Sequence, residues 1–151
     1  MIIKASVSDM ETVKHITLQT IKSIYPHYYP CGAVDFFINH HSDKNIYNDI
    51  ENDSVYLYYN DINIATGTIT IKENEISRFF VLPDYQGNGY GRELLSFAEN
   101  KIGEKSNTVM LAASLPAKAI YLKKGYSSME FNYIKTDNGD YLCYDVMIKY
   151  I

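Results

Sequence analysis

The residues best suited to chemistry lie between Ile76 and Leu95. An apolar run that ends near Val81 is followed by a turn with three glycines, and a helical segment begins at about Arg92. Backbone N–H groups at the start of a helix have no intrahelical partner, and the helix dipole adds partial positive charge there. Glycines let an anion approach these amides and tolerate positive φ. The pattern predicts an anion site, where the usual anion is a phosphate or pyrophosphate.

The spacing of this loop separates three known phosphate-binding patterns. A P-loop needs Gly-Lys-Ser/Thr, which occurs nowhere in the chain. A Rossmann fingerprint counted from Gly87 and Gly89 needs a further glycine where Arg92 stands. The observed spacing is Gln86-x-x-Gly89-x-Gly91, preceded by Val81-x-Pro83. This spacing resembles the acetyl-CoA loop of the GNAT superfamily of N-acetyltransferases.

A second signature follows further along the chain. Residues 108–114 form a short apolar run that predicts a strand, and the pattern after it is Ala117-x-x-x-Tyr121-x-Lys123-x-Gly125-aromatic. This pattern resembles the GNAT segment in which a helix flanks coenzyme A and supplies a tyrosine near the thioester sulfur. Many members carry Asn where Ser114 stands, and the resemblance implies a contact from this position to the pantetheine arm. The resemblance extends over roughly residues 2–149.

The resemblance also implies which groups hold acetyl-CoA. In the GNAT fold the fourth and fifth strands splay apart, and the pantetheine arm pairs with the free backbone between them, here Phe79, Phe80 and Val81. The Val81 N–H would polarise the thioester carbonyl in an oxyanion-hole role. The pyrophosphate would lie on the loop residues Gln86, Gly87, Asn88, Gly89, Tyr90, Gly91 and Arg92. For Arg92, a charge-assisted contact and an ordinary solvated position both stay open.

Two residues are candidates for proton transfer. A tyrosine is neutral at working pH, so Tyr121 can donate a proton to a departing thiolate. The alternative for Tyr121 is a packing role in the core. The attacking amine must lose a proton, and Glu75 stands where several family members place a general base, acting directly or through a water. The alternative for Glu75 is a turn carboxylate beside Lys72 and Glu73.

The acceptor pocket in this fold is lined in part by the loop between the first two helices. That loop is unusually aromatic here, with Tyr25, His27, Tyr28 and Tyr29 as candidate substrate-binding residues. Aromatic faces attract cations by about 0.5–2 kcal/mol each, which suits an amine. A lid of tyrosines over the core is the alternative. Residues 40–41 are adjacent histidines without a HExxH pattern, so no metal site is predicted.

Composition limits the remaining function classes. The 151 residues suit one domain spanning residues 1–151, with 46% apolar and 21% charged residues. A net charge of −4 argues against nucleic-acid binding and suits a cationic acceptor. No apolar run is long enough for a signal peptide or a membrane span. Cys31 and Cys143 lack CxxC spacing and are expected to be reduced thiols in a cytoplasmic protein.

The periodicity of apolar residues predicts an α/β fold. Strands are expected at 2–6, 55–59, 64–71, 75–82, 108–114, 129–136 and 141–148. Helices are expected at 8–24, 34–40, 43–49, 89–102 and 116–124, with a loop at 25–32. An Asn-Gly turn joins the last two strands into a hairpin. This order matches the GNAT fold, a mixed, mostly antiparallel sheet with helices on both faces and splayed fourth and fifth strands.

These patterns together favour an N-acetyltransferase. It would move an acetyl group from acetyl-CoA to a primary amine of a small molecule or protein, by direct attack in a ternary complex. The alternative is a catalytically silent acyl-CoA-binding module that senses the cofactor or regulates a partner. No nucleic acid or membrane partner is expected, and the tyrosine-rich terminal hairpin is a possible homodimer surface.

Overall fold

The computed structural model describes residues 1–151 and contains a seven-stranded sheet. Its strands are β1 (Ile2–Lys4), β2 (Val55–Tyr59), β3 (Ala65–Lys72), β4 (Glu75–Val81), β5 (Thr108–Ser114), β6 (Ser127–Lys135) and β7 (Tyr141–Tyr150). They pair in the order β1-β2-β3-β4-β5-β7-β6. The β4–β5 pair is parallel and every other pair is antiparallel. The predicted fold class, a mostly antiparallel mixed sheet, is confirmed.

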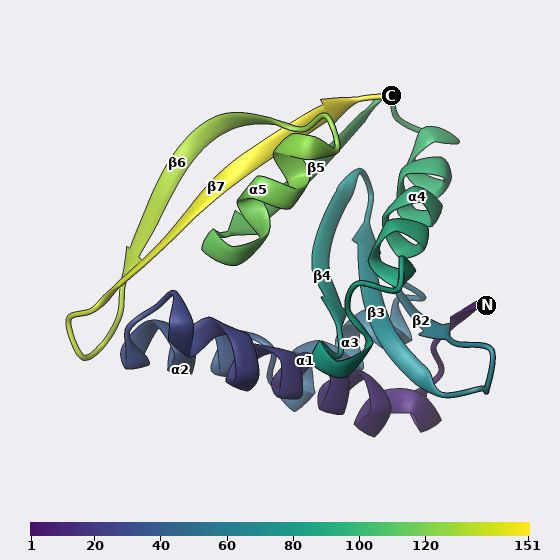
Figure 1. The fold of residues 1–151 in the computed structure, drawn as a ribbon, viewed down its shortest axis with the longest axis horizontal. Helices are drawn as coiled ribbons and strands as arrows, with labels where there is room; N and C mark the ends of the chain where they lie inside the picture. The colour runs from purple at the N-terminus through teal and green to yellow at the C-terminus, as the bar shows by residue number, and fades with distance from the viewer.

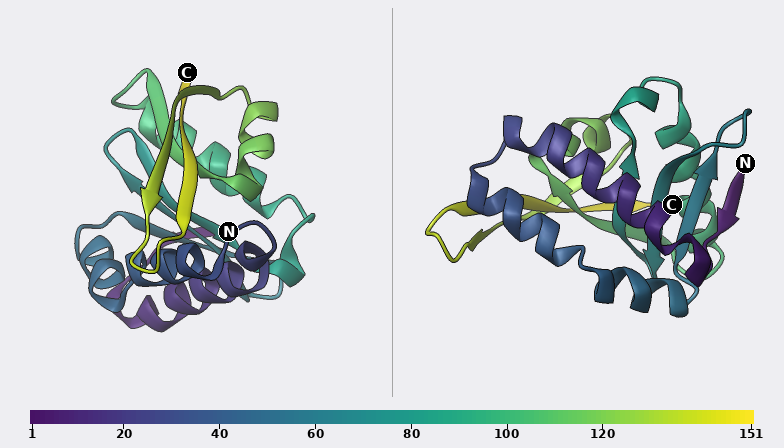
Figure 2. Two further views of the ribbon diagram at one scale, coloured as in Figure 1. Left: turned by 90° about the vertical axis from the view of Figure 1, so that its left-hand side faces the viewer. Right: turned by 90° about the horizontal axis from the view of Figure 1, so that it is seen from below.

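Five α-helices cover the sheet, with α4 and α5 on one face and α1, α2 and α3 on the other (Figure 1). They are α1 (Met10–Ile24), α2 (Cys31–His40), α3 (Asp43–Glu51), α4 (Tyr90–Gly103) and α5 (Leu115–Lys123). Short 3₁₀ turns occupy Val7–Asp9, Tyr25–His27 and Pro83–Tyr85. Seen from below, α1 lies beside a second row formed by α2 and α3 (Figure 2). No helix combines the length and apolarity needed to cross a bilayer.

The sheet separates two apolar cores, which explains why its strands carry apolar residues on both faces. On the α4–α5 side, Leu94 and Ala98 of α4 pack with Ile76 of β4 and Tyr121 of α5. On the opposite side, a second cluster joins α1, α2 and α3 to β2 and to Phe80 of β4. Neighbouring residues of β4 therefore contribute to different cores.

Helix boundaries differ from the sequence expectation by one or two residues in α3, α4 and α5, and the differences at the starts of α1 and α2 have a clear local cause. The expected loop at 25–32 is shorter, because Tyr25–His27 forms a 3₁₀ turn and α2 begins directly after Pro30. Proline is tolerated at a helix start because its missing N–H has no partner there. The first helix begins with a 3₁₀ turn in which the Ser6 N–H donates to the Asp9 carboxylate at 2.8 Å, and α1 follows from Met10.

The terminal hairpin reaches across to the start of α2. The N–H of Gly32, in the first turn of α2, donates to Asp140 Oδ2 at 2.9 Å. A Cβ at Gly32 would collide with Asn138 of the same hairpin turn. The N-cap Pro30 supplies no side-chain acceptor, so Asp140 satisfies an otherwise unpaired donor from 108 residues away.

Strand β6 forms the outer edge of the sheet and exposes apolar side chains. Phe131 is 61% exposed and Tyr133 65% exposed, and the Tyr133 ring packs against Tyr141 at 5.6 Å. Edge strands with unpaired backbone groups can pair with another chain. Dimerisation through this hairpin stays a prediction.

A buried ionic cluster ties α3 to the central strands. The Asp49 carboxylate accepts from Arg78 Nη2 at 2.9 Å and lies 2.6 Å from Lys72 Nζ. Arg78, only 3% exposed, also donates to Thr70 Oγ1 at 3.0 Å. Beside the cluster, burial and then the Arg78 charge lower the pKa of His41 to about 3. His41 is therefore neutral in the folded protein at neutral pH.

Replacing Asp140 by Ala should lower the free energy of unfolding by about 1 kcal/mol, because α2 loses its capping acceptor. Asp140→Asn should retain most of that stability, since an amide oxygen also accepts from the Gly32 N–H. Urea unfolding measures both values. Asp137→Ala, an exposed acid in the same turn, is the control and should change little. An equal loss in both alanine variants would contradict the capping role.

His41 should make the protein less stable in mild acid. In the unfolded chain His41 becomes protonated below its ordinary pKa of 6.5, whereas in the folded protein it stays neutral down to about pH 3. The contribution of His41 to the free energy of unfolding is therefore fully present above pH 6.5 and is lost as the pH decreases. The loss between pH 7 and pH 5 is about 2 kcal/mol.

Denaturant unfolding of the wild type and His41→Gln at both pH values measures the effect. The glutamine variant should lose about 2 kcal/mol less over this interval. His27→Gln, which changes an exposed histidine, should behave like the wild type. If His41→Gln and the wild type lose the same stability, the neutral buried state of His41 is wrong.

Candidate active site

Strands β4 and β5 pair over only two positions and then separate. Their parallel register joins Glu75 to Met110 and Ile76 to Leu111, and no further pair forms. Strand β5 stays paired with β7 along its whole length, while β4 stays paired with β3 up to Val81. Figure 1 shows β4 and β5 diverging from their shared end. We call this opening the fork.

The backbone of β4 turns alternate residues toward the fork. The Leu82 N–H donates to Thr66 O at 2.9 Å, so the backbone N–H and C=O of Phe80, two residues earlier, also point toward β3. The backbone groups of Phe79 and Val81 point the opposite way, toward the fork. The Val81 carbonyl accepts from Gln86 Nε2 at 2.9 Å and from Thr20 Oγ1 at 3.3 Å. The Val81 N–H and the Phe79 backbone therefore remain open to the fork. Of the three residues predicted to contact the pantetheine arm, Phe80 directs its backbone groups toward β3 and not toward the fork.

The loop after β4 presents a row of free amides. Gly87 and Gly89 have φ of +82° and +88°, a conformation that strains other residues. The first helical bond of α4 runs from the Glu93 N–H to Gly89 O at 3.1 Å. The N–H groups of residues 87–92 donate to no protein atom. These amides form the anion site that the glycine spacing predicts.

Side chains around the loop hold its shape and add charge. Asn88 Nδ2 donates to Tyr85 O at 3.0 Å, so the Asn88 side chain braces the turn. Tyr90 stacks on Tyr58 at 4.7 Å and fixes the first turn of α4 against β2. A Cβ at Gly89 would lie 3.4 Å from Arg92 Nη2, and Arg92 is exposed without an ion-pair partner. Its guanidinium is thus available beside the free amides. Gly91 faces Phe79 and Val81 of β4.

Tyr121 lies at the fork on the α4–α5 side of the sheet. Its ring is 6.4 Å from the ring of Phe79 and 5.5 Å from that of Tyr126. Burial, then the neighbouring Tyr25, raises the pKa of Tyr121 above its usual value near 10. The phenol is therefore protonated at any working pH and can donate a hydrogen bond.

Two tyrosines of the predicted acceptor loop turn inward. Tyr25 packs edge-on against Phe37 at 4.7 Å. Burial raises the pKa of Tyr25, and a hydrogen bond with Ser114 partly opposes that rise. The Tyr29 hydroxyl accepts from the Leu115 N–H at 2.7 Å and donates to Cys143 O at 2.9 Å. The loop is thereby tied to the start of α5 and to β7.

The structure does not bring together all predicted site residues. His27 and Tyr28 point to solvent, and Tyr28 is 52% exposed, so the four aromatic residues form no common cage. Glu75 lies at the closed end of the fork, paired with Met110. Six residues of strand place Glu75 about 20 Å from Val81. If the thioester lies at the Val81 N–H, Glu75 is therefore too far away to act as a direct base.

Sequence reasoning missed three residues around the fork. Thr20 of α1 caps the Val81 carbonyl, and Arg78 is buried although the sequence analysis gave it no role. Ser77 is the extra residue of a β-bulge, since Thr70 pairs with Arg78 while Ile71 pairs with Ile76. The position of Arg78 within an otherwise apolar strand could have indicated a buried charge. The bulge left no signal in the sequence.

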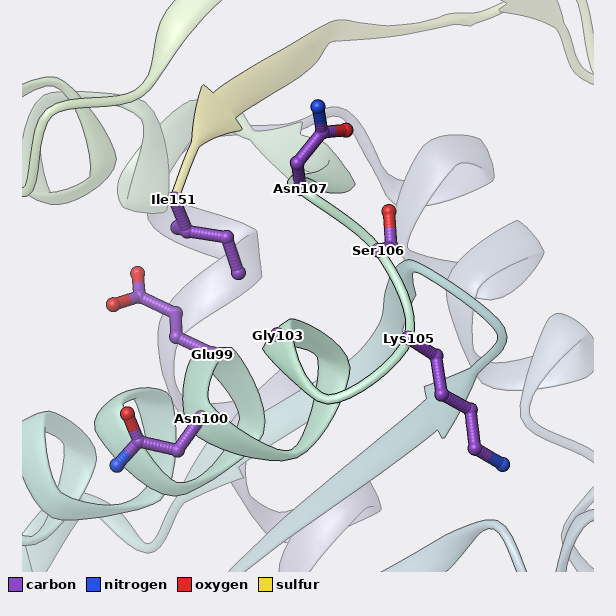
Figure 3. Close-up of a pocket in the computed structure, with 7 residues that line it drawn as sticks. All are labelled: Glu99, Asn100, Gly103, Lys105, Ser106, Asn107 and Ile151. Atoms are coloured by element: carbon purple, nitrogen blue, oxygen red, sulfur yellow. The ribbon is translucent and has the colours of Figure 1, made fainter.

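A surface hollow of about 540 Å³ lies elsewhere (Figure 3). It is lined by Glu99, Asn100, Gly103, Lys105, Ser106, Asn107 and Ile151. Gly103 ends α4, and a helix of this length separates the hollow from the glycine loop by about 21 Å. Glu99 in the hollow is already paired with Lys149 at 2.9 Å. No group of three or more His, Cys, Asp or Glu side chains is placed to hold a metal ion.

Several solved structures share this architecture. A GCN5-related N-acetyltransferase from Rhodopseudomonas palustris superposes with a TM-score of 0.89 at 18% identity, covering 100% of this chain and 95% of the other. The PaiA N-acetyltransferase of Thermoplasma acidophilum, solved with coenzyme A, gives 0.72 at 22% identity, covering 100% and 98%. The ribosomal-protein-S18-alanine N-acetyltransferase of Escherichia coli gives 0.71 at 19% identity, covering 100% and 93%.

At these identities the likeness shows a shared fold. No curated protein sequence matches the chain. The family model of the GNAT acetyltransferase domain, however, matches residues 24–139, which is most of the chain. The chain therefore belongs to the GNAT family of acetyltransferases and is an acyltransferase.

Proposed function

We propose that residues 1–151 act as one N-acetyltransferase domain that moves an acetyl group from acetyl-CoA to a primary amine by direct attack in a ternary complex. One observation carries this proposal. Unpartnered backbone groups lie on the fork edge of β4, at Phe79 and at the Val81 N–H, and a second set follows at the amides of residues 87–92. A ligand with a diphosphate at one end and amide groups along its arm matches these two sets of groups. The coenzyme A bound by the Thermoplasma relative has this chemistry.

The diphosphate belongs on the amides of residues 87–92, with the Arg92 guanidinium beside it. The helix dipole of α4 and several N–H donors then face the same anion. The pantetheine arm belongs along the fork edge of β4, where Val81 offers its N–H. Ser114, at the N-cap of α5, lines the opposite wall of the fork.

The acyl end of the donor belongs beside Phe79. Tyr121, the proposed acid, packs against Phe79. The departing sulfur must lie within hydrogen-bond reach of that hydroxyl. The Phe79 N–H then faces the thioester carbonyl as the oxyanion donor. This moves the oxyanion role two residues from Val81, which instead holds the pantetheine arm.

The reaction balances with the residues at the fork. The neutral amine attacks the thioester carbonyl, and a carbon–nitrogen bond forms. The carbon–sulfur bond breaks, and the thiolate takes the proton of the Tyr121 hydroxyl, which solvent restores. The proton of the amine leaves through water toward Glu75, because four residues of strand separate Glu75 from Phe79 by about 13 Å.

Gly89→Glu should weaken coenzyme A binding at least about hundredfold. Like charges about 4 Å apart near a protein surface repel by about 4 kcal/mol. Isothermal calorimetry measures the affinity. Gly139→Glu is the matched control, because Gly139 has φ of +89° and open space around it, so it takes the same strain and charge. Equal affinity in the two variants would place the diphosphate elsewhere.

Tyr121→Phe should lower kcat about hundredfold and leave coenzyme A affinity unchanged, because general acids contribute on the order of 10²–10⁴ in rate. Coenzyme A release with a panel of amines measures the rate. Tyr126→Phe is the control, since the Tyr126 hydroxyl donates a hydrogen bond to Glu99 at 3.0 Å and has no proposed role toward acetyl-CoA. Unaltered kcat in Tyr121→Phe would remove Tyr121 as the acid. Binding without turnover by the wild type across the panel would favour a silent binding module.

A further inference from the structure

A second, wholly polar pocket lies on the α1–α3 side of the sheet. Its volume is about 310 Å³, and no apolar residue lines it. The lining residues come from the end of α2, from α3, and from strands β3 and β4: His40, His41, Asn45, Asn48, Asp49, Lys72, Ser77 and Arg78. The pocket contains the buried ionic cluster of Asp49, Lys72 and Arg78.

The charges in this pocket do not cancel. Lys72 and Arg78 supply two cations, and both pair with the single carboxylate of Asp49. His41 adds no charge, because burial and Arg78 lower its pKa, and the pKa of His40 is lowered for the same reasons. Among the lining residues one positive charge is therefore left over. The surplus lies at the half-exposed Lys72, where an anionic oxygen gains a charge-assisted hydrogen bond, so the pocket favours a monoanion.

Two polar atoms in the lining lack partners. Arg78 uses Nη1 and Nη2 for Thr70 and Asp49, but its Nε–H donates to nothing. His41 Nδ1 is likewise without a hydrogen bond. Both side chains are more than nine-tenths buried, at 3% and 7% exposed. A buried donor without a partner costs about 1–3 kcal/mol, which an anionic oxygen would recover.

The pocket opens at the point where the two central strands part. Ser77, which lines it, directly follows Ile76, the last β4 residue paired with β5. Ser77 is also the bulged residue, and bulges commonly re-aim strands beside active sites. From Ser77 to Phe79 the strand rises only about 7 Å. The His41 ring packs edge-on against Phe80 at 5.6 Å, which ties the pocket wall to β4 two residues beyond Arg78.

We propose that this pocket binds a carboxylate of the acceptor, so that the preferred substrates are small primary amines that also carry a carboxylate. The inference rests on the proposed acetyl transfer and names its acceptor class. The carboxylate neutralises the surplus cation and accepts from Arg78. A short carbon chain then carries the amine past Ser77 to the acyl group beside Phe79. The acceptor approaches from the α1–α3 side and the donor from the α4–α5 side.

The test compares ω-amino acids of increasing length, from glycine to 6-aminohexanoate, each with its carboxamide. Both members of a pair carry the same primary amine, so only the anion differs. At the best length, kcat/KM for the acid should exceed that for the amide by about tenfold to hundredfold, as expected for a charge-assisted hydrogen bond. The gain should appear mainly in KM.

Two variants locate the effect. Lys72→Met removes a half-exposed cation, and Arg78→Lys keeps the charge toward Asp49 but removes the Nε donor. Each should reduce the acid-to-amide ratio at least about fivefold, within the value of one hydrogen bond. Lys105→Met, which changes an exposed lysine two residues beyond the end of α4, should keep the wild-type ratio. Thermal melts confirm folding, and Lys72→Met decides the question if Arg78→Lys unfolds.

The possible failures are distinct. If the amides and acids are acetylated at equal rates, the acceptor assignment is wrong while the proposed transfer stands. If inorganic phosphate raises the melting temperature and the ratio is still one, the pocket binds a separate anion, which also overturns the assignment. If no amine is acetylated although coenzyme A binds, the proposed transfer fails. Calorimetry with coenzyme A present then still tests whether the acid binds more tightly than its amide.

Discussion

Everything at this site depends on two parallel strands that stop pairing after two residues. Backbone N–H and C=O groups must find partners when water is excluded. On the fork side of β4, beyond the two positions paired with β5, side chains satisfy only the Val81 carbonyl, through Gln86 and Thr20. The Val81 N–H and the Phe79 backbone stay open, and a second set of free amides follows at residues 87–92. The missing sheet contacts thus become a binding edge of fixed geometry, which main chain alone provides.

The fork stays open because each strand belongs to a different half of the molecule. Strand β4 is held by β3 and by both apolar cores, whereas β5 is paired along its full length with β7. Tyr29 joins the halves on one side by bonding both the start of α5 and β7. Asp140 joins the hairpin to α2 in the same way. These long-range polar bonds fix the width of the opening without closing it.

The sequence predicted features that depend on local spacing, and it failed where side-chain direction depends on distant contacts. The glycine loop and the two motifs were readable because few residues permit φ near +88° at Gly89. The bulge at Ser77 was not readable, since it shows only in the register with β3. The aromatic loop gave four equivalent candidates, yet packing against Phe37 and bonding to α5 turned Tyr25 and Tyr29 inward and left His27 and Tyr28 outside.

The buried pair of Asp49 and Arg78 forms part of the proposed acceptor pocket. Apolar residues of similar volume often stabilise a protein as well as a buried ion pair does, so stability alone does not explain the pair. Its position offers a reason, because Ser77 places the same pocket at the closed end of the fork, where β4 and β5 part. In the proposed reaction the sheet separates two tasks, with uncharged backbone holding the donor on one face and charged side chains selecting the acceptor on the other. Under that proposal, donor binding stays constant while residues of α2 and α3 change acceptor choice.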